Sequence, residues 1–243
     1  HQVDSFEQEF SAYCDCRHTI GVASGLDALK LILRALDIGP GDEVIVPPMT
    51  FAATANCIVY QGGTPVFADV DAETLLIDPV CVEQKVTKRT KAVIAVDYAG
   101  QPCDYDALRA ITDRHGLALI ADGCHALGAT YKGKPVGAVA DMTAFSFHPV
   151  KHITTGEGGM ITTDSPDYAD RMRRFRNHGI SSDHRQREAQ GSWFYQMVDL
   201  GFNYRMTDIQ CALGISQLKK LPLWIDRRRE IAAQYDAAFS TTD

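Results

Sequence analysis

The chain has 243 residues, of which 45% are hydrophobic and 23% charged, and its formal net charge is −7 at neutral pH. This is the composition of a globular protein that can bury a large core. The negative charge argues against a general nucleic-acid binder and offers no basic stripe to an anionic membrane. No run approaches the roughly 20 apolar residues of a membrane span. We therefore predict partners that include neither nucleic acid nor a membrane.

Seven cysteines are scattered along the chain, an odd number without the spacing of a zinc or redox pair. Most of them lie in apolar runs, where a thiol is typically a small buried hydrophobe. A reducing cytoplasm is the expected location. No signal peptide is visible in a chain that opens at His1 rather than Met, and a polar Ser-Thr-Thr-Asp tail follows the last predicted helix. We expect segments to be missing at both ends.

Helical and strand patterns alternate along the interior. Periodicity and turn residues predict helices over 24–36, 51–60, 105–115, 168–176, 207–218 and 227–239, and strands over 43–46, 64–68, 92–96, 117–121, 143–147 and 160–162. This alternation implies an α/β fold with a mostly parallel central sheet flanked by helices on both faces. In such sheets, ligands bind beyond the carboxyl ends of the strands.

Two residues at predicted strand ends point to a particular chemistry. Lys151 lies between two short apolar segments, in a loop rich in Gly, Thr and Ser, and Asp122 follows the apolar run 118–121. A lysine amine can form a Schiff base, and a carboxylate can keep a ring nitrogen protonated; pyridoxal phosphate chemistry needs both groups. Considered alone, Asp122 could equally cap the next turn.

A phosphate site is predicted at the start of the helix over 24–36. The backbone N–H groups of Ser24, Gly25 and Leu26 and the helix dipole would suit an anion, although Ser-Gly before a helix is also a common N-cap. Ser146 lies one strand-turn before Lys151 and could donate its hydroxyl to the same phosphate. The alternative is a polar residue merely tolerated in a strand.

Histidines give weaker signals. His125, three residues beyond Asp122, could stack on a planar cofactor or be satisfied within a turn. His148 and His152 have the spacing of a helical metal site, but Pro149 and the following Thr-Gly run disfavour a helix, so no metal is predicted. The sequence also lacks the GxxxxGK[ST] and GxGxxG motifs, which argues against nucleotide hydrolysis and dehydrogenase chemistry.

Five motifs fall in the order of a known family. They are Ala23-Ser-Gly-Leu-Asp-Ala-Leu29, Pro47-Pro-Met-Thr-Phe51-Ala-Ala-Thr, Asp122-Gly-Cys-His125-Ala-Leu-Gly128, Phe145-Ser-Phe-His-Pro-Val-Lys151 and Gly201-Phe-Asn203-Tyr-Arg205-Met-Thr-Asp-Ile-Gln210. Together they resemble the DegT/DnrJ/EryC1/StrS nucleotide-sugar aminotransferases, which have the aspartate-aminotransferase fold (fold type I). The resemblance covers nearly the whole chain and implies pyridoxal 5'-phosphate as cofactor.

The resemblance also implies roles for individual residues. Lys151 would bind the cofactor covalently and carry the proton during catalysis, and Asp122 would pair with the pyridinium nitrogen. The remaining implied cofactor contacts are Phe51 and His125 near the ring, Ser24, Gly25, Leu26 and Ser146 at the phosphate, and Asn203 at the phosphate of a neighbouring subunit. Active sites would then be completed only in a homodimer. Position 26 is Leu where relatives often carry Thr, which limits any contact there to backbone.

The residues around Lys151, with Gly191-Ser-Trp-Phe-Tyr-Gln-Met-Val-Asp-Leu-Gly before Phe202, most resemble one branch of the family. That branch is the UDP-4-amino-4,6-dideoxy-N-acetyl-β-L-altrosamine transaminases of pseudaminic acid biosynthesis. It implies transfer of an amino group from glutamate to the 4-keto group of a UDP-linked 4-keto-6-deoxy-N-acetylhexosamine. Residues 1–243 would form the large cofactor-binding domain, without the C-terminal small domain.

Three alternatives stay open at this point. The acceptor could be another 3- or 4-keto nucleotide sugar, or the chain could be a non-catalytic homologue that binds cofactor or sugar. Related sugar dehydratases replace the Schiff-base lysine with histidine, so Lys151 disfavours dehydration.

Overall fold

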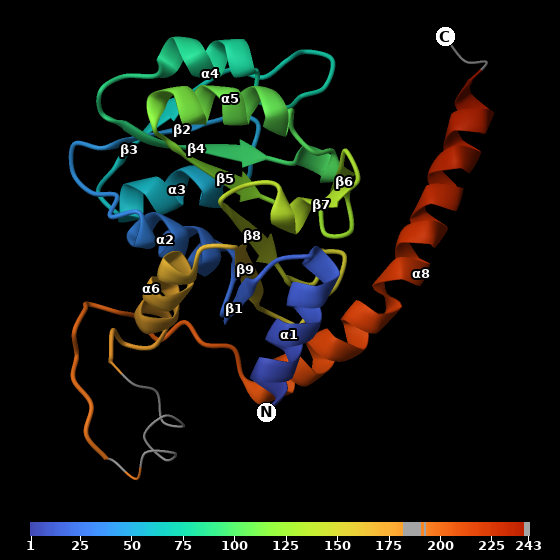
Figure 1. Cartoon of the computed structure of the whole chain (residues 1–243). Coiled ribbons are helices and arrows are strands. Elements are labelled where there is room, and N and C mark those ends of the chain that lie inside the picture. Colours follow the sequence, from blue (N-terminus) through green and yellow to red (C-terminus); the bar gives the residue numbers. More distant parts are fainter. Residues whose placement is uncertain (182–190, 192, 241–243) are drawn as a thin grey trace.

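The computed structural model describes residues 1–181, 191 and 193–240, and its centre is a seven-stranded sheet covered by helices on both faces (Figure 1). The strand order is β1-β9-β8-β5-β4-β2-β3. The strands are β1 (His18–Val22), β2 (Glu43–Val46), β3 (Thr64–Phe67), β4 (Thr90–Val96), β5 (Ala118–Asp122), β8 (Met142–Ser146) and β9 (Gly159–Thr163), and a separate small hairpin is formed by β6 (Thr130–Tyr131) and β7 (Lys134–Pro135). The predicted α/β architecture is confirmed.

One strand runs against the others. β9 pairs antiparallel with both β1 and β8, whereas the β8-β5, β5-β4, β4-β2 and β2-β3 pairs are parallel. Since β1 and β8 are both antiparallel to β9, they point the same way as the rest. The carboxyl ends of six strands therefore lie along one edge of the sheet.

Helices pack against both faces of the sheet because its strands carry apolar side chains on both faces. The helices are α1 (Gln2–Cys14), α2 (Gly25–Ala35), α3 (Ala52–Tyr60), α4 (Pro79–Lys85), α5 (Tyr105–His115), α6 (Pro166–Arg176) and α8 (Asp208–Phe239). Alternate strand residues face opposite sides. One apolar cluster joins one face to α2, α3 and α6; a second joins the other face to α4 and α5; a third packs α1 and α8 beside β8 and β9.

Most predicted elements are confirmed, with bounds that differ by a few residues. The segments that form α1, β1 and α4 were not predicted. The two helices predicted over 207–218 and 227–239 are wrong as separate elements, because α8 is a single helix that passes through Pro222. Proline removes one backbone hydrogen-bond donor from the helix. Leu218 and Leu221, in the turn before Pro222, are buried in the apolar cluster that packs α1 and α8 together, and their packing favours a continuous helix.

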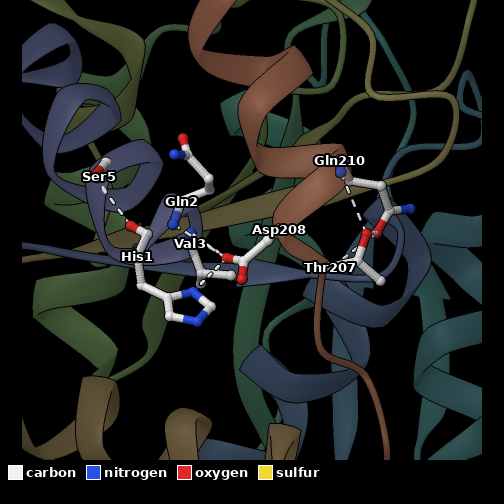
Figure 2. A network of polar contacts seen from close by, with 7 residues as sticks. All are labelled: His1, Gln2, Val3, Ser5, Thr207, Asp208 and Gln210. Atoms are coloured by element: carbon white, nitrogen blue, oxygen red, sulfur yellow. Dashed lines mark hydrogen bonds and ion pairs between the residues drawn. The ribbon is translucent and has the colours of Figure 1, made fainter.

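Asp208, in the first turn of α8, also holds the start of α1 (Figure 2). Its Oδ1 accepts hydrogen bonds from the backbone N of Gln2 (3.1 Å) and Val3 (3.2 Å) and contacts Nδ1 of His1. A carboxylate between two helix N-termini is favoured by both dipoles. α1 and α8 are therefore joined at their first turns.

Beyond its first half, α8 leaves the body of the molecule (Figure 1). Its buried residues end at Leu221, while Leu223 and Tyr235 are 71% and 60% exposed. No helix in the described part of the chain is both long and apolar enough to cross a membrane.

Candidate active site

The predicted site residues lie where strands end. β1 leads directly into the N-cap of α2, Asp122 is the last residue of β5, and Ser146 is the last residue of β8. These three strands finish at the same edge, so segments separated by about 100 residues in sequence are brought to one place. The carboxyl edge of this sheet is therefore the candidate site, as expected for an open α/β sheet.

Asp122 is buried and accepts hydrogen bonds from uncharged groups. Only 7% of the residue is exposed. Its Oδ2 accepts a hydrogen bond from Thr54 Oγ1 (2.7 Å), and its Oδ1 accepts one from the backbone N of Cys124 (3.2 Å). Both donors are uncharged, and a buried carboxylate is stabilised most by a cation. The carboxylate is thus held in a fixed orientation and suited to a positively charged partner.

The start of α2 approaches β8 closely. A Cβ atom added at Gly25 would lie only 2.8 Å from Cβ of Ser146, so a glycine is needed there. The hydroxyl of Ser24 caps the helix, accepting a hydrogen bond from Asp27 N at 3.1 Å. The side chain of Leu26 packs against the core beneath α2. Any anion contact from Ser24, Gly25 or Leu26 is therefore left to their backbone N–H groups.

Lys151 lies in a loop that is fixed on both sides. Phe147 and Ile153 are buried at 0% and 1% exposure, and the backbone N of Lys151 donates to His148 O at 2.9 Å. The loop closes where Gly159 meets α2, since a Cβ there would lie 2.7 Å from the backbone of Ser24. The two residues that flank the lysine loop, Ser146 and Gly159, therefore both lie against the start of α2.

The charges in the site affect one another. Burial lowers the pKa of His125; the charge of Lys151 lowers it further and that of Asp122 opposes the shift. Burial raises the pKa of the Cys124 thiol well above its usual range; Asp122 raises it further and Lys151 opposes the shift. Lys151 and Asp122 therefore both lie within electrostatic range of the turn at 124–125, where a neutral imidazole is favoured.

Phe51 and Asn203 lie on segments outside the strands that carry Asp122 and Ser146. Phe51 is the N-cap residue of α3 and is 77% exposed. Asn203 is also exposed, in an extended segment where it forms an isolated bridge with Asn177. Neither side chain is needed for the core of this chain.

No group of three or more His, Cys, Asp or Glu side chains in the described residues could hold a metal ion. His148 and His152 do not lie on a helix: His148 is exposed, and His152 lies further along the same loop, where burial lowers its pKa and Arg228, His125 and Lys151 add to the shift. Ser192, within the motif over 191–201, lies outside the described residues.

Sequence reasoning missed three residues that shape the site. Thr54 reaches Asp122 from α3, and no spacing rule would have indicated it. Tyr98 packs its ring edge-on to His125, with centroids 6.3 Å apart. Asp97 follows β4 as Asp122 ends the neighbouring β5, and the backbone N of Asp97 donates to Asp122 O at 3.1 Å. An aspartate after an apolar strand was a signal available in the sequence.

Asp97 is expected to make the stability of the cofactor-free protein pH-dependent. Burial, with a smaller contribution from the Asp122 charge, raises the pKa of Asp97 to about 7, although hydrogen bonds from Cys103 N and Tyr105 Oη oppose the shift. The folded-state pKa lies above the unfolded value, so this contribution to stability is complete below about pH 4 and is lost as the pH rises through about 7. Between about pH 4 and pH 7, the free energy of unfolding of the wild type should fall by up to about 4 kcal/mol relative to that of Asp97→Asn.

Urea unfolding of the wild type, Asp97→Asn and the exposed control Asp236→Asn at several pH values between 4 and 8 tests this expectation. A difference between wild type and Asp97→Asn that stayed constant with pH would show that Asp97 is ionised throughout.

Comparison with known proteins decides the family. The model of the DegT/DnrJ/EryC1/StrS aminotransferase family matches residues 1–243. The chain belongs to this family. Among curated relatives of the family, the spore coat polysaccharide biosynthesis protein SpsC of Bacillus subtilis is 48% identical over 239 residues, which are 98% of this chain and 61% of SpsC.

Several solved structures have the same fold. A putative sugar aminotransferase, Spr1654 of Streptococcus pneumoniae, was solved in PMP, PLP and apo forms; its PMP form has a TM-score of 0.94 and 37% identity, covering 99% of this chain and 66% of that one. Helicobacter pylori PseC, an aminotransferase of pseudaminic acid biosynthesis, has a TM-score of 0.91 and 34% identity, covering 100% of this chain and 64% of that one. The chain thus spans about two thirds of the length of these relatives.

The donor set agrees with what a DegT/DnrJ/EryC1/StrS protein needs for pyridoxal phosphate. Within the described residues, the oriented carboxylate of Asp122 accepts hydrogen bonds from uncharged donors, and a pyridinium N–H would supply the cation. The start of α2 offers backbone N–H groups beside the hydroxyl of Ser146, where a Cβ on Gly25 would intrude. Lys151 supplies the primary amine at the same edge.

Proposed function

We propose that the protein containing this chain is a pyridoxal phosphate-dependent aminotransferase of nucleotide-linked keto sugars. The observation that carries the proposal is the convergence of Lys151, Asp122 and the start of α2 at one sheet edge. An amine for covalent attachment, a carboxylate for the ring nitrogen and a helix N-terminus for the phosphate meet the three binding needs of this cofactor.

When bound, pyridoxal phosphate supplies an aldehyde that accepts an amino group and a ring that stabilises negative charge on the adjacent carbon. The chain's own residues do the rest. Asp122 holds a proton on the ring nitrogen; Phe51 and His125 confine the ring; Ser24, Gly25, Leu26 and Ser146 bind the phosphate.

Lys151 attaches the cofactor and, once released, moves the proton. Its Nζ removes a proton from Cα of the amino donor in the first half-reaction and delivers a proton to the sugar carbon in the second. Water supplies the keto oxygen of the 2-oxo acid that the donor becomes, and the sugar's carbonyl oxygen leaves as water in the second half-reaction.

We further propose glutamate as the donor and a UDP-linked 4-keto-6-deoxy-N-acetylhexosamine as the acceptor. The resemblance of the Lys151 segment to pseudaminic acid enzymes and the likeness to PseC support this choice. The higher identity to SpsC supports a role in cell-surface polysaccharide synthesis without specifying the sugar. The alternatives are amination of another 3- or 4-keto nucleotide sugar and a non-catalytic homologue that binds cofactor or sugar.

Residues 1–243 form the large, cofactor-binding domain in this proposal. The protein acts in the cytoplasm as a homodimer in which Asn203 reaches the phosphate site of the neighbouring subunit. Exposure of Asn203 and of the apolar Leu200 and Ile209 on either side of it supports a second copy at this surface.

Adding glutamate to the full-length, cofactor-loaded protein should convert the pyridoxal absorbance to that of the pyridoxamine form. A panel of UDP- and dTDP-linked 3-keto and 4-keto sugars should then restore the original spectrum for one acceptor. An unchanged spectrum with glutamate and with other amino acids, in intact loaded protein, would refute the aminotransferase; conversion by glutamate but restoration by a 3-keto sugar would refute only the proposed acceptor.

A further inference from the structure

Lys30, in the middle of α2, has three aromatic rings around its ammonium group. Nζ lies 5.4 Å from the ring centroid of Tyr60, 5.2 Å from that of Phe202 and 4.7 Å from that of Tyr204. It also donates a hydrogen bond to the hydroxyl of Tyr204. All three rings are within the roughly 6 Å reach of a cation–π interaction. One cation therefore joins α2, the end of α3 and the segment 202–204.

Two of these rings flank Asn203. Phe202 and Tyr204 stack with centroids 4.6 Å apart and planes 3° from parallel. Side chains alternate along extended backbone, so a ring pair held against α2 turns the residue between them the other way. Accordingly, Asn203 is exposed whereas both rings are partly buried against the core.

Segment 202–204 is attached to α2 at two points. Ala23 N, just before the N-cap Ser24, donates to Tyr204 O at 2.9 Å. Lys30 makes the second attachment seven residues later, which is about two helical turns along α2. Backbone hydrogen bonds also join this segment to residues 175–178. The two attachments to α2 add to these bonds and help to fix the direction of the segment as well as its position.

We propose that Lys30 is a positioning residue: through the stacked Phe202–Tyr204 pair, it fixes the direction in which Asn203 reaches the phosphate site of the neighbouring subunit. This inference rests on the shared site of the proposed function. Lys30 itself touches no cofactor. Lys30 of one subunit therefore affects cofactor binding in the site of the other subunit, although the helix that carries it, α2, begins at the site of its own subunit.

The first test measures the dissociation constant of pyridoxal phosphate for full-length variants. Lys30→Met keeps the length of the side chain and removes its charge, and should weaken binding roughly 10-fold, the scale of one hydrogen bond to a charged group. Lys30→Arg should retain most of the affinity, since guanidinium also binds aromatic faces. Lys85→Met, an exposed lysine at the end of α4, is the control.

The decisive test uses mixed dimers of differently tagged chains. In a Lys30→Met/Lys151→Ala dimer, the site that keeps Lys151 belongs to the Lys30→Met chain but receives Asn203 from a chain with Lys30 intact. Borohydride fixes cofactor only where Lys151 is present, so that site is read alone. It should bind cofactor with wild-type affinity, which also shows that the Lys30→Met chain folds.

If that site stays as weak as in the Lys30→Met homodimer, Lys30 acts within its own subunit and the proposal is wrong. It is also wrong if Lys30→Met binds normally. Asn203→Ala variants test the premise that Asn203 contacts the cofactor phosphate of the neighbouring subunit. If Asn203→Ala homodimers bind cofactor normally, this shared contact does not exist and the proposal for Lys30 fails with it. The reaction of the wild type with glutamate tests the aminotransferase activity separately.

Discussion

Replacing Lys151 by alanine will leave the protein unable to form a borohydride-stable bond with pyridoxal phosphate and will slow both half-reactions by about 10³-fold or more. The chain places this amine at the carboxyl edge of the sheet, within electrostatic range of His125 and Cys124. Alanine removes both the point of covalent attachment and the group that moves the proton. Mass spectrometry after borohydride reduction and single-turnover absorbance with glutamate measure the two losses.

Lys88→Ala provides the matched control, because this exposed lysine precedes β4, outside the site. Borohydride should fix the cofactor to Lys88→Ala, and this variant should react with glutamate like the wild type. If Lys151→Ala still gained the mass of the reduced cofactor at one lysine, the attachment residue would have to be assigned elsewhere.

Asp122→Asn should slow the glutamate half-reaction by about 10²- to 10³-fold, the range typical for loss of a preorganised electrostatic group. Asparagine can still accept the hydrogen bond from Cys124 N on its one oxygen, and its amide N–H can donate to the Thr54 hydroxyl, which then acts as acceptor. It carries no negative charge, however, so the ring nitrogen loses the partner that keeps it protonated. Rapid-mixing absorbance with saturating glutamate measures the rate.

A cofactor methylated at the ring nitrogen separates charge from geometry. Its nitrogen is permanently cationic, so it should recover a large part of the rate in Asp122→Asn without improving Thr54→Val, which removes only the hydroxyl donor. If Asp122→Asn is slowed equally with both cofactors, Asp122 acts by positioning the ring and not by keeping the ring nitrogen positively charged.

Sequence reasoning reached the chemistry of this site because its main groups lie in contiguous motifs. Asp122 follows a recognisable apolar strand, and Lys151 lies between two others, so the strand rule alone placed them at one edge. The α/β class followed from the same alternation. The roles given to Phe51 and Asn203 rested on resemblance alone, whereas the positions of Ser24, Gly25, Leu26, His125 and Ser146 also suggested theirs. All of these roles stay predictions.

The contacts that sequence could not supply are those between distant segments. Thr54 reads as one polar residue in an apolar helix, yet it donates to a carboxylate 68 residues away. Lys30 reads as the solvated face of α2, but its ammonium is surrounded by rings from three other positions. Pro222 reads as the end of a helix, and only the packing of Leu218 and Leu221 shows why α8 continues.

The antiparallel direction of β9 has a consequence for how far Lys151 can travel. If the strand after β8 were parallel to it, the chain would have to cross the sheet to begin that strand at the opposite edge. Because β9 is antiparallel to β8, residues 147–158 form the loop of a hairpin at a single edge. Both ends of that loop are hydrogen-bonded into the sheet, which limits how far the loop can carry a released Lys151 amine. Its effective concentration at the reacting carbons therefore stays high through both halves of a turnover.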